Sequence, residues 1–192
     1  MARRAAIEVP VPELIRRGYD RAKGLGHDGP EKVRLSHRDF LADLRSVAPG
    51  ELPAPADLNG AAHLVFDPDL FVGIYRPAPS PRLLPLLMSV LEGESELWIS
   101  HGWLKHAVAA FQRQGADVRA VPVWIASMTV MPRWAGPAAQ LPEAAAGLSE
   151  QARVTLAAAI SAQRAGPTLL VAPDGPLAQV AMGLDGLKVS TR

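Results

Sequence analysis

Residues 96–128, ELWISHGWLKHAVAAFQRQGADVRAVPVWIASM, hold the strongest architectural signal in the chain. Residues 96–100 form a strand-like run, and residues 101–114 space their apolar side chains along one helix face before Gly115 ends the helix. Residues 117–128 are again rich in strand-forming side chains. This order predicts a strand–helix–strand unit, in which the two strands run parallel and the crossover is right-handed.

The alternation of strands and helices continues toward the C-terminus. Residues 129–148 are rich in Pro, Ala and Gly and predict a long loop. Ser149 is a favoured N-cap for the helix that follows this loop. Residues 168–172 and 187–190 are predicted strands, and a short helix is expected between them at 177–183.

Upstream of residue 96 the predicted elements are shorter. Residues 62–66 and 70–75 predict two short strands, joined by a turn at the Asp-Pro-Asp sequence of residues 67–69. An apolar helix is expected from residue 80 onward. Because Pro85 falls in its second turn and lacks an N–H group, this helix either starts late or kinks.

The N-terminal third differs from the rest of the chain. Residues 12–23 and 36–47 suit two amphipathic helices, and residues 48–60, with three prolines and two glycines, suit a connector. We expect residues 1–54 to form a helical arm or cap and residues 55–192 to form one compact α/β domain. The predicted fold is α/β, with a mostly parallel sheet of about five or six strands flanked by helices.

Composition excludes several classes of function. The chain has 192 residues and no cysteine, which excludes disulfides, thiolate nucleophiles and iron–sulfur clusters. A net charge of +1 gives no overall attraction to nucleic acid or membranes. No apolar run approaches the roughly 18 residues of a membrane helix, and no hydrophobic segment follows Arg3 and Arg4, so we expect a cytoplasmic protein without membrane contact. Abundant Ala, Arg, Gly and Pro, which share GC-rich codons, indicate a prokaryotic gene.

Polar side chains directly follow three of the predicted strands, at the end where parallel α/β sheets bind ligands. Ser100, His101 and Asp174 are candidate catalytic residues there, because a histidine at a helix N-terminus stays neutral and can act as a base. Structural roles explain them as well: Ser100 caps the helix, His101 is a polar first-turn residue, and the G-x-S-x-G sequence of nucleophilic serines is absent. Asp67 would lie on the same rim.

The acidic residues and histidines do not predict a metal site. Asp67 and Asp69 could form a carboxylate pair for a divalent cation, but Asp-Pro-Asp and Asp174-Gly175 are also ordinary turn sequences, which is the interpretation we favour. The five histidines lack a spacing suited to one shared metal. The glycine-rich sequences that bind dinucleotides or phosphates are absent, so no cofactor is expected.

Two sets of residues are candidates for binding a macromolecule. Arg16, Arg17 and Arg21 lie on the first predicted helix, where they could contact nucleic-acid phosphates or form a solvated helix face. Trp103 and Trp134 are predicted at a helix start and in a loop, where an indole often marks an interface or a pocket wall. Partial burial inside the domain explains both tryptophans equally well.

Three functions follow from these residues. The first is a non-catalytic binding or assembly protein that acts through protein–protein contacts, with a protein partner or as a homo-oligomer. We favour it because each catalytic candidate has a structural explanation. The second is a small hydrolase-like α/β enzyme with a polar site at the strand ends. The third is a nucleic-acid-binding protein that uses the basic N-terminal helix.

Overall fold

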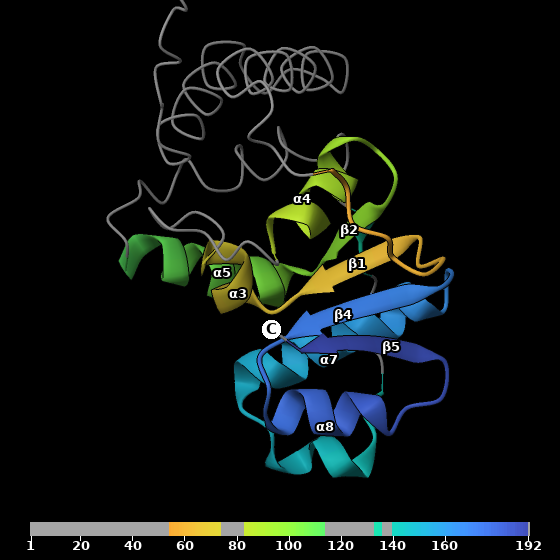
Figure 1. Cartoon of the computed structure of the whole chain (residues 1–192). Coiled ribbons are helices and arrows are strands. Elements are labelled where there is room, and N and C mark those ends of the chain that lie inside the picture. Colours follow the sequence, from red (N-terminus) through yellow and green to blue (C-terminus); the bar gives the residue numbers. More distant parts are fainter. Residues whose placement is uncertain (1–53, 74–82, 114–132, 136–139, 192) are drawn as a thin grey trace, which may run out of the picture.

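A parallel β-sheet forms the centre of the fold, which is seen in a computed structural model describing residues 54–73, 83–113, 133–135 and 140–191 (Figure 1). Its strand order is β3-β2-β1-β4-β5, and every neighbouring pair is parallel. The α/β class with a parallel sheet is therefore confirmed. The strands are β1 (His63–Phe66), β2 (Glu96–Ile99), the short β3 (Arg133–Trp134), β4 (Thr168–Ala172) and β5 (Leu187–Thr191).

Helices cover both faces of this sheet. Side chains alternate between the faces along a strand, so Leu64 and Phe66 of β1 pack in one apolar core and Val65 packs in the other. The first core also takes side chains from α3 (Pro68–Gly73), α4 (Leu84–Leu91) and α5 (His101–Arg113). The second takes them from η1 (Glu143–Gly147), α7 (Glu150–Gln163) and α8 (Pro176–Met182).

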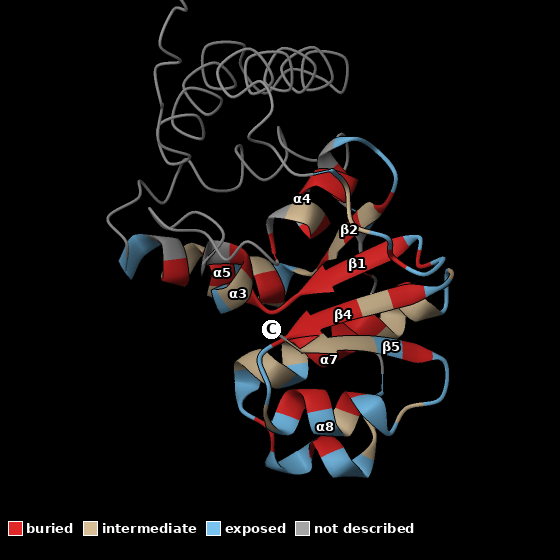
Figure 2. Cartoon of the chain, in the orientation of Figure 1, coloured by how far each residue is buried: buried red, intermediate tan, exposed pale blue. Residues whose placement is uncertain are grey.

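Strand β1 is the most enclosed element of the sheet. It pairs with β2 through His63 and Leu64 and with β4 along its whole length, so both of its edges are hydrogen-bonded. All four of its residues are buried, as the colouring of Figure 2 shows. A strand enclosed on both faces and both edges is expected to be a short, nearly continuous apolar run, as HLVF is.

Several local signals act as predicted. Ser149 caps α7, because its side chain accepts a hydrogen bond from the Ala152 N–H. The predicted strand at 62–66, the short helix near 177–183 and the last strand correspond to β1, α8 and β5. Helix α4 begins only at Leu84 and holds Pro85 in its first turn, where the missing N–H group is not needed.

Two predicted elements are wrong. Residues 70–73, the described part of the strand predicted at 70–75, are helical: Pro68–Gly73 is helix α3, and the Phe71 N–H bonds to the Asp67 carbonyl at 2.9 Å. The sequence at 67–69 is therefore a helix start and not a turn between strands, because Asp67 acts as a cap and Pro68 supplies a helical φ angle. Trp134, predicted in a loop, lies in strand β3 beside β2.

Other predictions lie outside the described residues. These are the N-terminal helical arm, all of which up to residue 53 is undescribed, and the strand at 117–128. The described strand that follows α5 and pairs with β2 is β3, at Arg133–Trp134. None of the described helices combines the length and the apolar character required to cross a membrane.

Trp103 supplies a test of the first apolar core. It is fully buried, its ring meets Phe71 edge-on at 5.2 Å between centroids, and its Nε1–H donates to the Phe66 carbonyl at 2.5 Å. We expect Trp103→Phe to lower the free energy of unfolding by about 1–3 kcal/mol, because it leaves a buried carbonyl without this donor. Urea denaturation measures the loss. Lys105→Ala, an exposed position on the same helix, is the control and should change stability by less than about 0.5 kcal/mol. Equal stabilities of the two variants would contradict this role of the indole.

Candidate functional site

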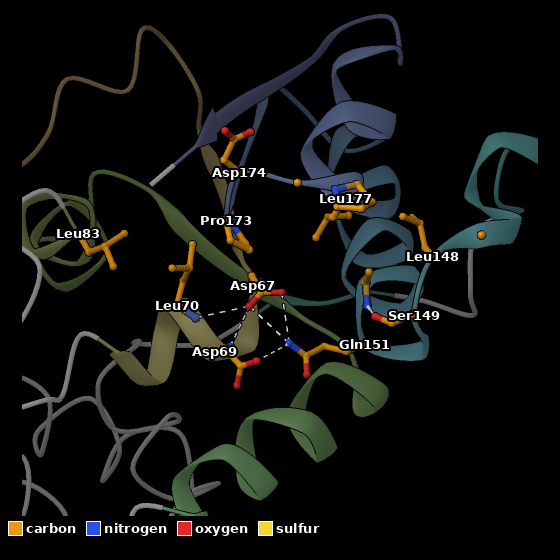
Figure 3. A pocket seen from close by; sticks show the side chains of 14 residues that line it. Asp67, Asp69, Leu70, Leu83, Leu148, Ser149, Gln151, Pro173, Asp174 and Leu177 are labelled. Atoms are coloured by element: carbon orange, nitrogen blue, oxygen red, sulfur yellow. Dashed lines mark hydrogen bonds between the residues drawn. The ribbon is translucent and has the colours of Figure 1, made fainter.

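A cavity of about 720 Å³ opens at the carboxyl ends of β1 and β4 (Figure 3). From β1 the chain turns to β2 on one side, and β4 later pairs on the other side. In open parallel sheets the crevice at such a reversal of strand order is the usual ligand site. The cavity is lined by Asp67, Asp69, Leu70, Leu83, Gly147, Leu148, Ser149, Gln151, Ala152, Pro173, Asp174, Gly175, Pro176 and Leu177.

Asp67 is fixed at the floor of the cavity by the backbone around it. Its N–H donates to the Val171 carbonyl at 2.7 Å, which continues the pairing of β1 with β4 by one residue. Its Oδ1 accepts from the N–H groups of Asp69, at 2.9 Å, and Leu70, at 3.4 Å. The residue is therefore both the end of the central strand and the cap of α3, and its carboxylate has little freedom to move.

Gln151, in the first turn of α7, joins the acidic residues of the β1–α3 connection. Its Nε2–H₂ group lies 3.4 and 3.3 Å from the two carboxylate oxygens of Asp67 and 3.1 Å from Oδ2 of Asp69. Arg113, at the end of α5, contacts Oδ1 of Asp69 at 3.0 Å. Three helices thus meet at this acidic pair, as the dashed lines of Figure 3 show for Gln151.

Burial perturbs the protonation of Asp67. The residue is only 5% exposed, and loss of hydration raises the pKa of its carboxyl group above the ordinary value of 3.8. The hydrogen bonds from Gln151 and from the Asp69 and Leu70 N–H groups lower this pKa, and the charge of Asp69 raises it again. Since burial is the largest contribution, Asp67 holds its proton more tightly than an exposed aspartate does.

The rest of the cavity combines one more carboxylate with apolar walls. Asp174 follows β4 and is exposed at the rim, so the structure does bring Asp67 and Asp174 to one site, as the strand-end rule predicts. Figure 3 shows the leucine side chains on both sides of Asp67. Leu70 and Leu83 belong to the α3 and α4 side, whereas Leu148 and Leu177 belong to the α7 and α8 side.

Ser100 and His101 do not line this cavity. The Ser100 side chain accepts a hydrogen bond from the Trp103 N–H at 3.1 Å and so caps α5, and His101 is an exposed residue of its first turn. Strand β1 lies between β2 and β4, so the strands that precede Ser100 and Asp174 are not neighbours and are two strand spacings, about 10 Å, apart. Their joint catalytic role stays a prediction.

The predicted binding residues that the structure describes, Trp103 and Trp134, do not line this cavity. Trp103 is fully enclosed in the first core and presents no surface to a partner in this structure. Trp134 lies in β3 at the edge of the described sheet. The predicted nucleic-acid contacts Arg16, Arg17 and Arg21 lie outside the described residues.

Gln151 is the site residue that sequence reasoning missed. The cap at Ser149 places it in the first turn of α7, but its approach to Asp67 depends on how α7 packs against β1, which no local pattern encodes. Within the part of the chain that the structure describes, no group of three His, Asp or Glu residues lies close enough to hold a metal ion.

No protein-family model, curated protein or solved structure matches the chain significantly. The function must therefore be argued from the chemistry of the site itself.

The raised pKa of Asp67 predicts a specific pH dependence of stability. Because the folded state binds this proton more tightly than the unfolded state, the stability contributed by Asp67 falls as the pH rises from 3.8 through the raised value. Asp67→Asn keeps the oxygen that caps α3 and removes the titration. We expect its unfolding free energy, relative to the original chain, to improve steadily over this pH range and then level off.

Urea unfolding at a series of pH values measures this difference. Asp185→Asn, at an exposed position outside the cavity, is the control for the loss of one carboxylate. A difference between Asp67→Asn and the original chain that does not vary with pH, or that varies no more than for Asp185→Asn, would show that burial does not perturb Asp67.

Proposed function

We propose that this chain is a small-molecule-binding α/β domain whose site is the cavity at the ends of β1 and β4. The observation that carries the proposal is the buried carboxylate of Asp67, which lies on the lining of this cavity. Burying a carboxylate costs free energy, and buried carboxylates are often found at functional sites, where their chemistry is needed. The cavity volume of about 720 Å³ also lies within the range of small-molecule sites.

The rigidity of the lining supports the same proposal. Asp67 is held by β4, α3 and α7 at once, through Val171, its own helix and Gln151. The polar groups therefore stand in position before a ligand arrives, and binding does not have to order them. Apolar walls next to a few fixed polar groups are the usual composition of a ligand site.

A small hydrolase-like enzyme is the second candidate, and one observation favours it. A carboxyl group whose pKa is raised by burial can donate and accept protons at a pH closer to neutrality. Under this proposal Asp67, together with Asp174 at the rim, takes the place of the set Ser100, His101 and Asp174. Formation of a product from a bound ligand distinguishes the enzyme from a binding domain.

The other functional predictions rest on the sequence alone. An assembly protein would use apolar surface, but among the side chains that the structure describes Met182, at 58% exposed, is the only large apolar one that is largely exposed. The remaining proposals from the sequence are a protein partner or homo-oligomer, nucleic-acid binding by the N-terminal arm, a prokaryotic source and a cytoplasmic location.

A fragment screen by NMR tests the proposed site. We expect several small molecules to shift the backbone amide signals of residues 147–152, 174, 175 and 177 in the full-length, isotope-labelled chain. Asp174→Trp, which places an indole at the cavity rim, should weaken the binding of these molecules by at least about fivefold, because the indole competes with them for the space.

Asp185→Trp provides the matched control, since it introduces the same side chain at an exposed position away from the cavity. It should leave the affinities unchanged. Fragments that bind only at other places, or with equal affinity to the Asp174→Trp variant, would exclude this cavity as the binding site.

A further inference from the structure

The charges that line the cavity restrict the ligands that it can accept. Three carboxylates, those of Asp67, Asp69 and Asp174, line it, and none of the described lining residues is Lys, Arg or His. Phosphates, nucleotides and carboxylic acids would be repelled, since like charges in a partly enclosed site interact strongly. On the basis of the proposed function, this asymmetry of charge identifies a class of ligand.

The negative charge of Asp67 is not balanced by a cation within the described residues. Its hydrogen-bond donors are the two backbone N–H groups of α3 and the Gln151 amide, which are all neutral. Arg113 contacts Asp69 instead, on the outer oxygen Oδ1, and its side chain is 63% exposed. A buried carboxylate with neutral donors attracts a charged donor more strongly than an exposed one does.

One oxygen of Asp67 also has acceptor capacity to spare. Oδ1 accepts from two backbone N–H groups and, at 3.4 Å, from the Gln151 amide, whereas Oδ2 has one described partner, the same amide at 3.3 Å. A carboxylate oxygen accommodates about two donors, and a charge-assisted bond to it is shorter, at about 2.7–2.9 Å. Oδ2 thus offers a position where a stronger donor than the amide could bind.

The leucine side chains of the lining favour a ligand with a hydrocarbon part. Leu70 and Leu83 on one side and Leu148 and Leu177 on the other flank the carboxylates (Figure 3). A small inorganic cation would leave these walls in contact with water, whereas a ligand with a hydrocarbon part would cover them and gain the associated free energy.

We infer that the ligand of this cavity is an amphiphilic organic cation, with an ammonium head on Oδ2 of Asp67 and an apolar body of several carbons against the leucine walls. The ammonium group has three N–H donors and a positive charge, whereas the Gln151 amide has two N–H donors and no charge. Asp174 at the rim adds longer-range attraction for the same head group. An acidic floor below apolar walls complements a ligand with a cationic head and an apolar body.

A matched series of probes tests the ligand class. Hexylammonium, hexan-1-ol and hexanoate share one chain length and differ in the charge of the head, and methylammonium keeps the head without the chain. We expect hexylammonium to bind at least about tenfold more tightly than hexan-1-ol, because only the cation forms a charge-assisted bond. The affinity for hexylammonium should also be at least about tenfold higher than for methylammonium, because the hexyl group is buried against the leucine walls. Hexanoate should not bind measurably.

Substitutions locate the effect. NMR titrations of the full chain follow residues 147–152, 174, 175 and 177, with MgCl₂ alone as an additional probe. Asp67→Asn should abolish the preference for hexylammonium over hexan-1-ol. Asp174→Asn, which changes an exposed residue and leaves the fold intact, should weaken the binding of hexylammonium by about threefold without affecting the binding of hexan-1-ol. Asp185→Asn, outside the lining, should change neither affinity.

The outcomes separate this inference from the proposed function. If hexanoate or hexan-1-ol binds in the cavity as tightly as hexylammonium, or if screening fragments bind there and no amine does, the cavity is a ligand site and the inferred class is wrong. If MgCl₂ alone shifts these signals and hexylammonium does not, the acidic floor is a metal-ion site and the inference is also overturned. If neither the series nor any fragment binds in the cavity, the proposed function fails with it.

Discussion

Strand β1 is paired in parallel on both edges, with β2 on one side and β4 on the other, and the position of the site depends on this double pairing. Both neighbours of β1 follow it in the sequence and lie on opposite sides of it, so the strand order reverses at β1 and a crevice opens between β1 and β4 beyond their carboxyl ends. The residue at that point is Asp67, whose N–H still takes part in the pairing with β4. The location of the cavity is therefore a property of strand order, while its chemistry is a property of one residue and the helices that surround it.

The burial of Asp67 illustrates how the fold tolerates a charge in its interior. Loss of hydration disfavours the ionised carboxylate, and the Asp69 and Leu70 N–H groups together with Gln151 recover only part of that loss, so the pKa stays raised. Replacing the carboxylate by an amide of the same shape would keep the cap on α3 and avoid the charge. The helix cap alone thus does not explain an aspartate here. Under the proposed function, ligand binding is the reason for an ionisable group at this position.

The sequence was sufficient for the elements whose signals are local and insufficient for those that depend on packing. Ser149 predicted its helix correctly, since a cap needs only the residues that follow it. Residues 70–75 contain Leu, Phe, Val, Ile and Tyr and so suggested a strand, yet Asp67 and Pro68 before them are a cap and a first-turn residue. The start signal outweighed the side-chain preference because the Asp67 carboxylate takes up the orphan N–H groups of α3. Gln151 could not be predicted, because its partners lie about eighty residues away in the chain and meet it only once α7 is packed on β1.

Under the proposed function, the two oxygens of Asp67 separate its structural role from its ligand-binding role. Oδ1 is committed to the fold, since it accepts from both backbone N–H groups at the start of α3 as well as from Gln151, whereas Oδ2 meets the Gln151 side chain and no other described donor. A ligand that binds Oδ2 therefore competes with one neutral side chain and leaves the helix cap unbroken. The same carboxylate can then change its partner in the cavity without loosening the connection between β1 and α3. In this proposal the short helix of six residues can border the cavity, because its first turn is held by an oxygen that the ligand does not need.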